Sequence, residues 1–406
     1  MKARLRIATL VAVGTIYGVQ GIAPAIPGIQ DHLGLGDSAP GLLTAAYMLP
    51  AVLFALPFGY LADVVGRRWV FVVNVVIWSI AGAAQAYAQS FVLLLILRCV
   101  QGIGFAALMP LSVTIIGDAL HGVAQMRAQA SRQVMMTAGE FGLPLVGAAL
   151  AGLSWNAPLL AQAALLPLAV VGVFVLDDHR HVETGLRGYG AALRDAVSLV
   201  GMPALLTAGF LRFWCKFATV SYVPYLLVRH HGASPVQAAL VIGASSLVAA
   251  VVATQVVGLL RRFRASTLLS GSVVVVGVTM IGMALAPGWQ LALAIAVAFG
   301  AGDGVLMVAQ NAVVTEIAPP AVRAGLIAAN GMVRNAGKLL GPLAVGALIV
   351  FISPALAVAF VGVAALATLP LLRPLASLDS SMADIVVVGS GVLPTNERNA
   401  DASRVR

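Results

Sequence analysis

Long apolar segments alternate with short polar ones along almost the whole chain. A membrane-spanning helix needs about 20 mainly apolar residues, and the sequence offers twelve such segments. They fall at residues 6–27, 41–62, 69–89, 91–117, 128–152, 156–176, 201–228, 235–259, 267–287, 289–317, 322–350 and 353–372. The pattern predicts an all-α membrane protein with twelve transmembrane helices.

The first six segments resemble the last six when the sequence is shifted by 198 residues. At that offset glycine, methionine and proline positions coincide, namely Gly102 with Gly300, Met109 with Met307, Gly139 with Gly337 and Pro144 with Pro342. Such repetition predicts two pseudo-symmetric six-helix halves. We expect them at residues 1–176 and 201–373, with a cytoplasmic linker at 177–200 and a polar, disordered cytoplasmic tail at 374–406.

Composition supports a membrane environment. The chain is 60% hydrophobic and 10% charged, and its mean hydropathy is +0.99, whereas soluble domains carry about 25% charged residues. The formal charge of +9 suggests nucleic acid, but the basic residues form no patch interleaved with aromatic residues. The two cysteines, Cys99 and Cys215, lie in apolar segments and offer no metal-ligand spacing. We expect no enzyme, no cofactor and no nucleic-acid partner.

The basic residues also predict an orientation. Outside the spans they gather in alternate connections, and the other connections hold only Arg229. The positive-inside rule then places both termini in the cytoplasm, for a multi-pass protein of the cell inner membrane. The basic start of the chain, followed by an apolar run, is similar to a signal peptide, but we expect an uncleaved first span.

The loop between the second and third predicted spans carries a motif. It reads Gly-Tyr-Leu-Ala-Asp-Val-Val-Gly-Arg-Arg and resembles the loop motif of the major facilitator superfamily at Gly59, Leu61, Asp63, Gly66, Arg67 and Arg68. The resemblance implies the twelve-helix major facilitator fold, a monomer, and secondary transport by alternating access. In that family the motif is a cytoplasmic gate, in which an aspartate such as Asp63 latches the two halves.

Seven charged residues that lie well inside the predicted spans, away from their ends, are the candidates for function. They are Arg98, Glu140, Arg212, Lys216, Asp303, Arg334 and Lys338. Each costs about 2.5–3.5 kcal/mol at the bilayer centre, so these side chains must face one another, water or a substrate. They fall on the fourth, fifth, seventh, tenth and eleventh spans, and the resemblance implies that these helices surround a central substrate cavity.

Spacing sharpens the prediction. Arg212 and Lys216 are four residues apart, as are Arg334 and Lys338, so each pair projects from one helix face. Like charges repel, and an acid or an anionic substrate should lie near each pair. The 198-residue shift places Glu140 on Lys338, which suggests an ion pair between the halves, either switching during transport or fixed.

Two helix motifs point to proton coupling. Arg98, Gln101, Gly102 and Gly104 resemble the fourth-helix motif of the superfamily, whose arginine is implicated in coupling. The segment from Gly139 to Gly147 resembles the fifth-helix motif of the drug–proton antiporter branch, and departs from it at Leu143 and Ala148. The resemblance implies that Arg98 takes part in proton coupling, and we expect Glu140 and Asp303 to be the acids that carry the protons. Burial favours the neutral form of a carboxyl group, which suits the two acids to carrying protons.

The sequence leaves several functions open. Our first prediction is a secondary active transporter that exports a small organic molecule in exchange for protons. Five buried cations against two acids favour an alternative, proton-coupled uptake or exchange of an organic anion. A non-transporting membrane receptor is a third possibility. Polar residues on the cavity helices, Tyr17, Gln20 and Gln310, either contact substrate or form hydrogen bonds between helices.

Overall fold

The computed structural model describes residues 2–120, 122–177, 201–260, 262–317 and 323–379. These residues form helices and their connections, without a strand. Most of the predicted linker and tail therefore lies outside the described residues. The predicted boundaries between the halves, the linker and the tail stay predictions.

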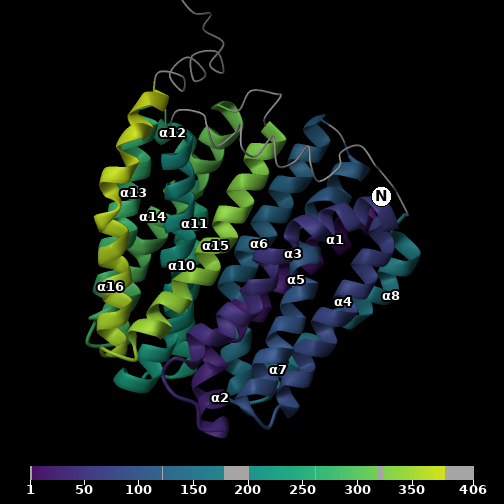
Figure 1. The fold of residues 1–406 in the computed structure, drawn as a ribbon, viewed down its shortest axis with the longest axis horizontal. Helices are drawn as coiled ribbons and strands as arrows, with labels where there is room; N and C mark the ends of the chain where they lie inside the picture. Colours follow the sequence, from purple (N-terminus) through teal and green to yellow (C-terminus); the bar gives the residue numbers. More distant parts are fainter. Residues whose placement is uncertain (1, 121, 178–200, 261, 318–322, 380–406) are drawn as a thin grey trace, which may run out of the picture.

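The helices form two groups that stand side by side in Figure 1, and we call them the first half and the second half. The first half contains α1 (Lys2–Ile16), α2 (Ile26–Leu33), α3 (Ala39–Val65), α4 (Arg67–Ala84), α5 (Phe91–Ala119), α6 (Gly122–Ala151), α7 (Ala157–Leu160) and α8 (Leu166–Val175). The second half contains α10 (Met202–His231), α11 (Pro235–Ala253), α12 (Val256–Leu260), α13 (Ala265–Ala284), α14 (Trp289–Ile317), α15 (Arg323–Leu348) and α16 (Pro354–Ala367), followed by a 3-10 segment, η5 (Leu369–Leu378).

Each predicted span overlaps a helix of the described chain. Nine helical stretches among the described residues are long and apolar enough to cross a membrane. The remaining three contain α3, α10 and α15. The apolar stretch of α3, Ala39–Phe54, is shorter, and α10 and α15 each carry two of the buried cations, which lower their hydropathy. For these three helices the crossing stays a prediction.

Two segments are less regular than the sequence suggests. The first span continues from α1 through a π-helical turn, η1 (Tyr17–Gly21), and a 3-10 turn, η2 (Ala23–Ala25), into α2. The sixth contains a 3-10 turn, η4 (Ala161–Leu165), between α7 and α8. A π-helical turn leaves backbone groups out of the regular hydrogen-bond ladder, and this becomes important at Gly18.

The internal repeat is visible in the packing. Gly102 of α5 lies against α3, where an added Cβ would stand 2.3 Å from the carbonyl oxygen of Tyr47. Gly300 of α14 lies against α11, where a Cβ would stand 2.2 Å from the carbonyl oxygen of Ser245. Both contacts need glycine because the backbones touch. The partners, like the glycines, are 198 residues apart, so the two halves repeat the same helix crossing.

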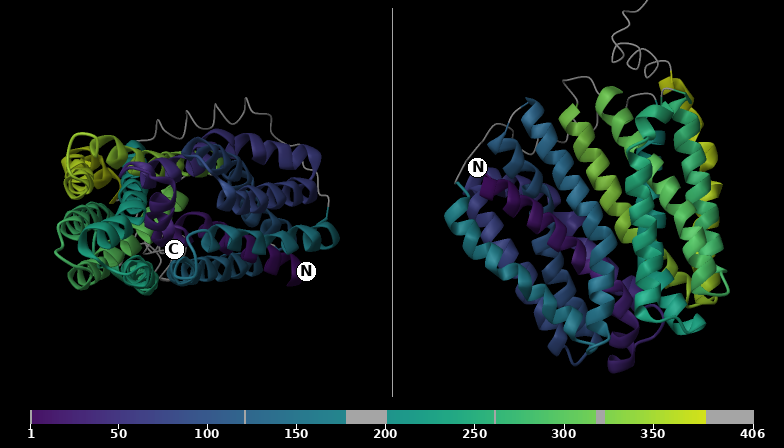
Figure 2. Two further views of the ribbon diagram at one scale, coloured as in Figure 1. Left: turned by 90° about the horizontal axis from the view of Figure 1, so that it is seen from below. Right: turned by 180° about the vertical axis from the view of Figure 1, so that it is seen from behind.

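The halves meet along α3 with α15 and α6 with α11, while α10 also contacts α2, η2 and α3. Figures 1 and 2 show that α2 lies at one end of the bundle and the N-terminus at the other. We call these the α2 end and the Gly66 end, after the loop between α3 and α4. At the α2 end the hydroxyls of Thr44 and Ser221 are 2.9 Å apart, and the hydroxyl of Tyr222 accepts from the Gly41 amide at 3.1 Å.

Candidate functional site

Six charged residues lie near one another, and we call them the charged cluster: Arg212, Lys216, Arg334, Lys338, Glu140 and Asp303. A salt bridge between α10 and α14 forms its centre. Arg212 donates from Nε to Oδ1 of Asp303 at 2.5 Å and from Nη2 to Oδ2 at 3.0 Å. Each side chain is only 4% exposed. The two parallel bonds fix both groups, because the planar guanidinium matches the carboxylate. The arrangement satisfies one predicted cation and one predicted acid within the second half.

Lys216, one turn further along α10, joins the two halves. Its Nζ donates to Oε2 of Glu140 on α6 at 2.8 Å and to Oδ2 of Asp303 at 3.2 Å. Glu140 is the more accessible acid, with 21% of its side chain exposed against 4% for Asp303. One ammonium group therefore holds an acid from each half.

Arg334 and Lys338 of α15 have different neighbours. The Phe213 ring lies under three cations: Arg212 Cζ and Arg334 Cζ are each 4.7 Å from its centroid, and Lys338 Nζ is 5.1 Å away. Lys338 also donates to Oδ1 of Asn335 at 3.2 Å. Among the described residues neither Arg334 nor Lys338 forms an ion pair.

The structure therefore does not form the expected ion pair between Glu140 and Lys338. The partner of Glu140 is Lys216. The ammonium of Lys338 instead lies within 6 Å of Phe105, Phe213 and Phe217. The sequence shift predicts that the two residues occupy related places in their halves, but related places need not be in contact.

Arg98 of α5 lies in a separate polar network of the first half. Its Nη1 donates to the carbonyl oxygen of Gly18 at 2.6 Å, a carbonyl in the π-helical turn, and its Cζ lies 6.0 Å from the Tyr47 ring centroid. Buried amides continue the network, since Gln101 accepts from Gln85 at 2.8 Å and donates to Gln162. The described hydrogen bonds of Arg98 include none to a carboxylate.

The predicted polar contact residues divide between these regions. The Tyr17 hydroxyl and the Gln20 Oε1 are buried in the first half without a hydrogen-bond partner in the described structure, and the Tyr17 ring packs in an apolar cluster with Leu43 and Leu94. Gln310 of α14 donates to Oδ1 of Asn330 on α15 at 2.7 Å. That bond connects two helices, one of the two roles that the sequence left open for Gln310.

The loop motif lies at the Gly66 end. Gly66 separates α3 from α4 with φ 109° and ψ 139°, a conformation that favours glycine. Arg67 forms an ion pair with Asp118 at the end of α5, and Arg68 donates to the Leu176 carbonyl at 2.6 Å. Gly59 and Asp63 belong to α3, and the side chain of Asp63 lies outside the described part of the structure, so its latch role stays a prediction.

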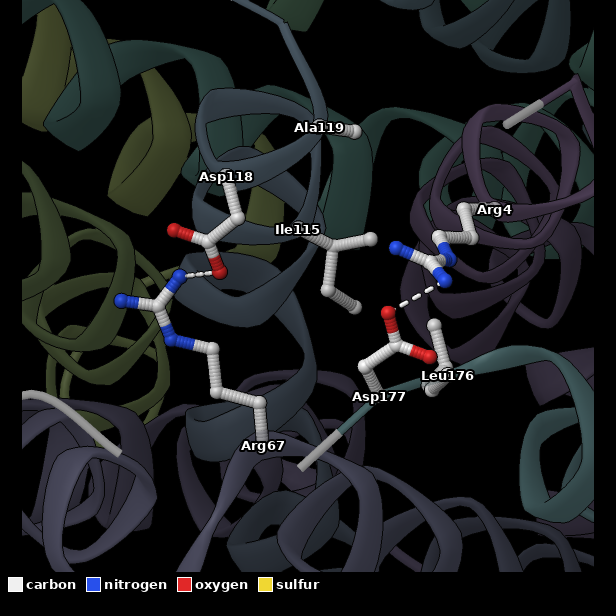
Figure 3. Close-up of a pocket in the computed structure, with 7 residues that line it drawn as sticks. All are labelled: Arg4, Arg67, Ile115, Asp118, Ala119, Leu176 and Asp177. Carbon is white, nitrogen blue, oxygen red and sulfur yellow. Dashed lines mark ion pairs between the residues drawn. The ribbon is translucent and has the colours of Figure 1, made fainter. Parts of the chain in front are cut away.

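A small pocket opens beside this loop (Figure 3). Its walls are Arg4, Arg67, Ile115, Asp118, Ala119, Leu176 and Asp177. Two ion pairs face each other across it, Arg67 with Asp118 and Arg4 with Asp177. The second pair ties the start of α1 to the end of the sixth span. Both pairs lie within the first half, far from the charged cluster.

The aromatic residues around the cluster were not predicted as site residues. Phe213 and Phe217 lie on α10 beside Arg212 and Lys216, at the same four-residue spacing. That spacing is the signal by which they could have been found, although aromatic residues are common on apolar helices. The described residues contain no group of three His, Cys, Asp or Glu side chains placed to hold a metal ion.

The fold agrees with a family comparison. The sequence model of the Major Facilitator Superfamily matches residues 8–258 and 205–384, which together cover most of the chain. The chain belongs to the Major Facilitator Superfamily. It is a multi-pass membrane protein, and its relatives and the solved folds that it resembles are membrane transporters, not enzymes.

Individual relatives match only in part. The Multidrug transporter protein MdtP of Bacillus subtilis is 37% identical over 116 residues, 29% of this chain and 20% of that protein. The uncharacterized transporter EfpA of Mycobacterium tuberculosis is 29% identical over 184 residues, 43% of this chain and 34% of that protein. The Sphingosine-1-phosphate transporter SPNS2 of Mus musculus is 29% identical over 126 residues, 30% of this chain and 22% of that protein. The matched regions thus span between 20% and 34% of the length of these relatives.

Solved structures resemble the whole fold. A bacterial homolog of the human lysosomal transporter spinster, in an inward-facing and unoccupied conformation, has a TM-score of 0.74 at 20% identity and covers 93% of this chain and 95% of its own. A D-xylose-proton symporter has the same TM-score, 0.74, at 15% identity, covering 91% and 97%. These similarities concern the fold alone.

Proposed function

We propose that the protein is a secondary active transporter that exports a small organic molecule across the cytoplasmic membrane by alternating access, in exchange for protons. The observation that carries this proposal is the position of Lys216, which contacts Glu140 of the first half and Asp303 of the second. Alternating access requires contacts between halves that form and break. An ion pair between the halves that includes an accessible acid meets this requirement.

Glu140 is the acid of the cluster to which we assign proton exchange. It has one cationic partner and a partly exposed side chain, whereas Asp303 is held by Arg212 and Lys216 and is nearly sealed. A neutral Glu140 no longer attracts Lys216, and the ammonium keeps only its contact with Asp303. The link between the halves then weakens. Arg98, in its separate network, would couple the first half to this step through the Gly18 carbonyl.

The closed contacts at the α2 end suggest which side is shut. Tyr222 with Gly41, Thr44 with Ser221, and Arg229 with Asp31 all join the halves there. The positive-inside rule assigns the Gly66 end, with its Arg67 and Arg68, to the cytoplasm. In this orientation the outer side is closed, both termini are cytoplasmic, and the loop at Gly66 acts as the cytoplasmic gate.

Export is supported by two Bacillus subtilis relatives, one named a multidrug transporter protein and the other a multidrug resistance protein. The excess of cations in the cluster favours the second candidate, proton-coupled uptake or exchange of an organic anion. The protein would work as a monomer embedded in the bilayer in either case. The two candidates differ in the charge of the solute and in the direction of its movement.

Reconstitution tests the proposal. Purified protein in lipid vesicles is given a pH gradient, and movement of ethidium and of 1-naphthalenesulfonate is followed by fluorescence. We expect wild-type protein to move one of them with the gradient, and Glu140→Gln and Asp303→Asn to lose this drive. Asp177→Asn is the matched control, since it neutralises an acid outside the cluster. Full pH-driven transport by both cluster variants would contradict the coupling role, and no flux by wild-type protein would favour a receptor.

A further inference from the structure

The four cations of the cluster divide into two kinds. Arg212 and Lys216 on α10 are paired with both acids of the cluster. Arg334 and Lys338 on α15 form no ion pair with any described residue and lie instead against the ring of Phe213. We propose that Arg334, Lys338 and Phe213 form a binding site for an organic anion with a flat aromatic portion, and we call these three residues the anion site. The inference rests on the proposed transport function and specifies its cargo.

The charges of Arg334 and Lys338 favour a bound anion. Cations inside a bilayer-spanning bundle are costly unless an anion accompanies them. The two acids cannot serve Arg334 and Lys338, because Asp303 already makes three contacts with Arg212 and Lys216, and Glu140 contacts Lys216 at 2.8 Å. The cluster therefore contains two cations that form no ion pair with a described residue. A bound anion would balance them.

Aromatic rings surround the ammonium of Lys338. Lys338 Nζ lies 5.1 Å from the Phe213 ring, 5.7 Å from the Phe217 ring and 5.9 Å from the Phe105 ring. Phe105 belongs to the first half and the other two to the second, so the rings line the interface between the halves. Aromatic faces stack on flat apolar groups, which favours a carboxylate or sulfonate on an aromatic body over a small inorganic anion.

Arg334 and Lys338 are more accessible than the salt bridge at the centre of the charged cluster. Arg212 and Asp303 are nearly sealed, whereas Arg334 and Lys338 are half-buried. Asn335, next to them on α15, connects the halves through its Nδ2, which donates to the Ala51 carbonyl of α3 at 3.2 Å, and accepts from Lys338. A ligand at Lys338 would thus touch a residue that also holds the interface. This links occupation of the anion site to the movement of the halves.

Binding to three matched probes tests the inference. The full chain in lipid nanodiscs is titrated by equilibrium dialysis with 1-naphthalenesulfonate, neutral 1-naphthalenemethanol and cationic 1-naphthylmethylammonium, with empty nanodiscs as the blank. We expect binding of the sulfonate and at least about tenfold weaker binding of the other two, since a charge-assisted contact contributes that much or more. Equal binding of the ammonium, or equal binding of inorganic sulfate as a competitor, would overturn the proposal.

Variants locate the site. Arg334→Gln and Lys338→Gln should each weaken sulfonate binding by about tenfold, whereas Arg264→Gln, at an exposed arginine in the connection before α13, should leave it unchanged. If Lys338→Gln proves unstable, Arg334→Gln decides, because it removes a charge of the anion site without leaving an acid unpaired. Lys338→Arg keeps the charge and should keep binding. Unchanged binding by Arg334→Gln and Lys338→Gln would place the anion elsewhere and overturn the assignment.

The proposal can fail separately from the transport function. If vesicles with wild-type protein expel ethidium with the pH gradient but the nanodiscs do not bind the sulfonate, transport stands and the anion site is wrong. If the nanodiscs bind the sulfonate through Arg334 and Lys338 but vesicles move no solute, the anion site stands and the transport proposal fails.

Discussion

The ammonium of Lys216 lies 2.8 Å from a carboxylate oxygen of Glu140, across the interface between the two halves. The same ammonium lies 3.2 Å from Asp303 in its own half. Lys216 is 6% exposed, whereas 21% of the Glu140 side chain is exposed, so solvent reaches this contact from the side of the acid. One ammonium group thus contacts two acids, one from each half of the protein.

Removing Lys216 should therefore destabilise the protein, and removing Glu140 as well should restore part of the loss. Breaking a buried ion pair by deleting one partner costs about 3–5 kcal/mol, because the other charge stays buried and unpaired. We expect Lys216→Met to lower the melting temperature of the purified protein clearly more than Lys216→Met combined with Glu140→Gln. The full set of single and double variants forms a cycle that isolates the pair. Strict additivity of the two changes would contradict a direct contact.

Substitution of Arg212 and of Arg334, which both lie against the Phe213 ring, should lower the stability of the protein by different amounts. Arg212→Gln leaves Asp303 without its bidentate partner and should cost about 3–5 kcal/mol of unfolding free energy. Arg334→Gln removes a cation that stacks on Phe213 without leaving an unpaired acid, and should cost about 2 kcal/mol or less. Thermal unfolding of the two variants in the same detergent gives the comparison. A larger loss for Arg334→Gln would show that Arg334 has an acidic partner in solution.

Much of this cluster follows from sequence reasoning, and the limits of that reasoning are physical. The insertion cost of charge identifies Arg212, Lys216, Glu140 and Asp303 as residues that need partners, and the structure brings these four together. The insertion cost does not determine which acid pairs with which cation, because the pairing depends on the rotation of α6 and α10 about their axes. Rotation also decides that Phe213 faces three of the cations, while Phe105 and Phe217 approach Lys338 alone.

The repeat gave more precise information about packing than about chemistry. The glycines at 102 and 300 contact residues that are themselves 198 positions apart, so the register of the helix crossings follows from the offset. Glu140 and Lys338 obey the same offset but do not pair. Backbone contacts in two related halves repeat because each half folds around the same crossings, whereas side-chain pairing between the halves depends on how they dock. Docking changes during alternating access.

The repeated crossing predicts matched effects of alanine substitution. In Gly102→Ala and Gly300→Ala the new methyl would stand 2.3 Å and 2.2 Å from a backbone carbonyl oxygen, so the helices must separate. Overpacking of this kind costs about 1–3 kcal/mol, and we expect similar falls in melting temperature for the two variants. Gly142→Ala on α6 is the control, since nothing lies within 4 Å of its added Cβ. That change should raise stability slightly, by about 0.4–1 kcal/mol. A fall for Gly142→Ala as large as the others would contradict the crossing argument.

The closed α2 end offers a direct test of alternating access. The hydroxyls of Thr44 and Ser221 are 2.9 Å apart on helices of different halves, so Thr44→Cys with Ser221→Cys should form a disulfide on oxidation. The native Cys99 and Cys215 are first replaced by alanine, and their removal alone provides the control. The crosslinked protein should lose transport in vesicles, because the α2 end can no longer open, and reduction should restore it. Leu42→Cys with Ser221→Cys shifts one cysteine two residues along α3 and should crosslink far less. Undiminished transport by the oxidised Thr44→Cys/Ser221→Cys protein would show that the contacts at this end do not separate during the cycle.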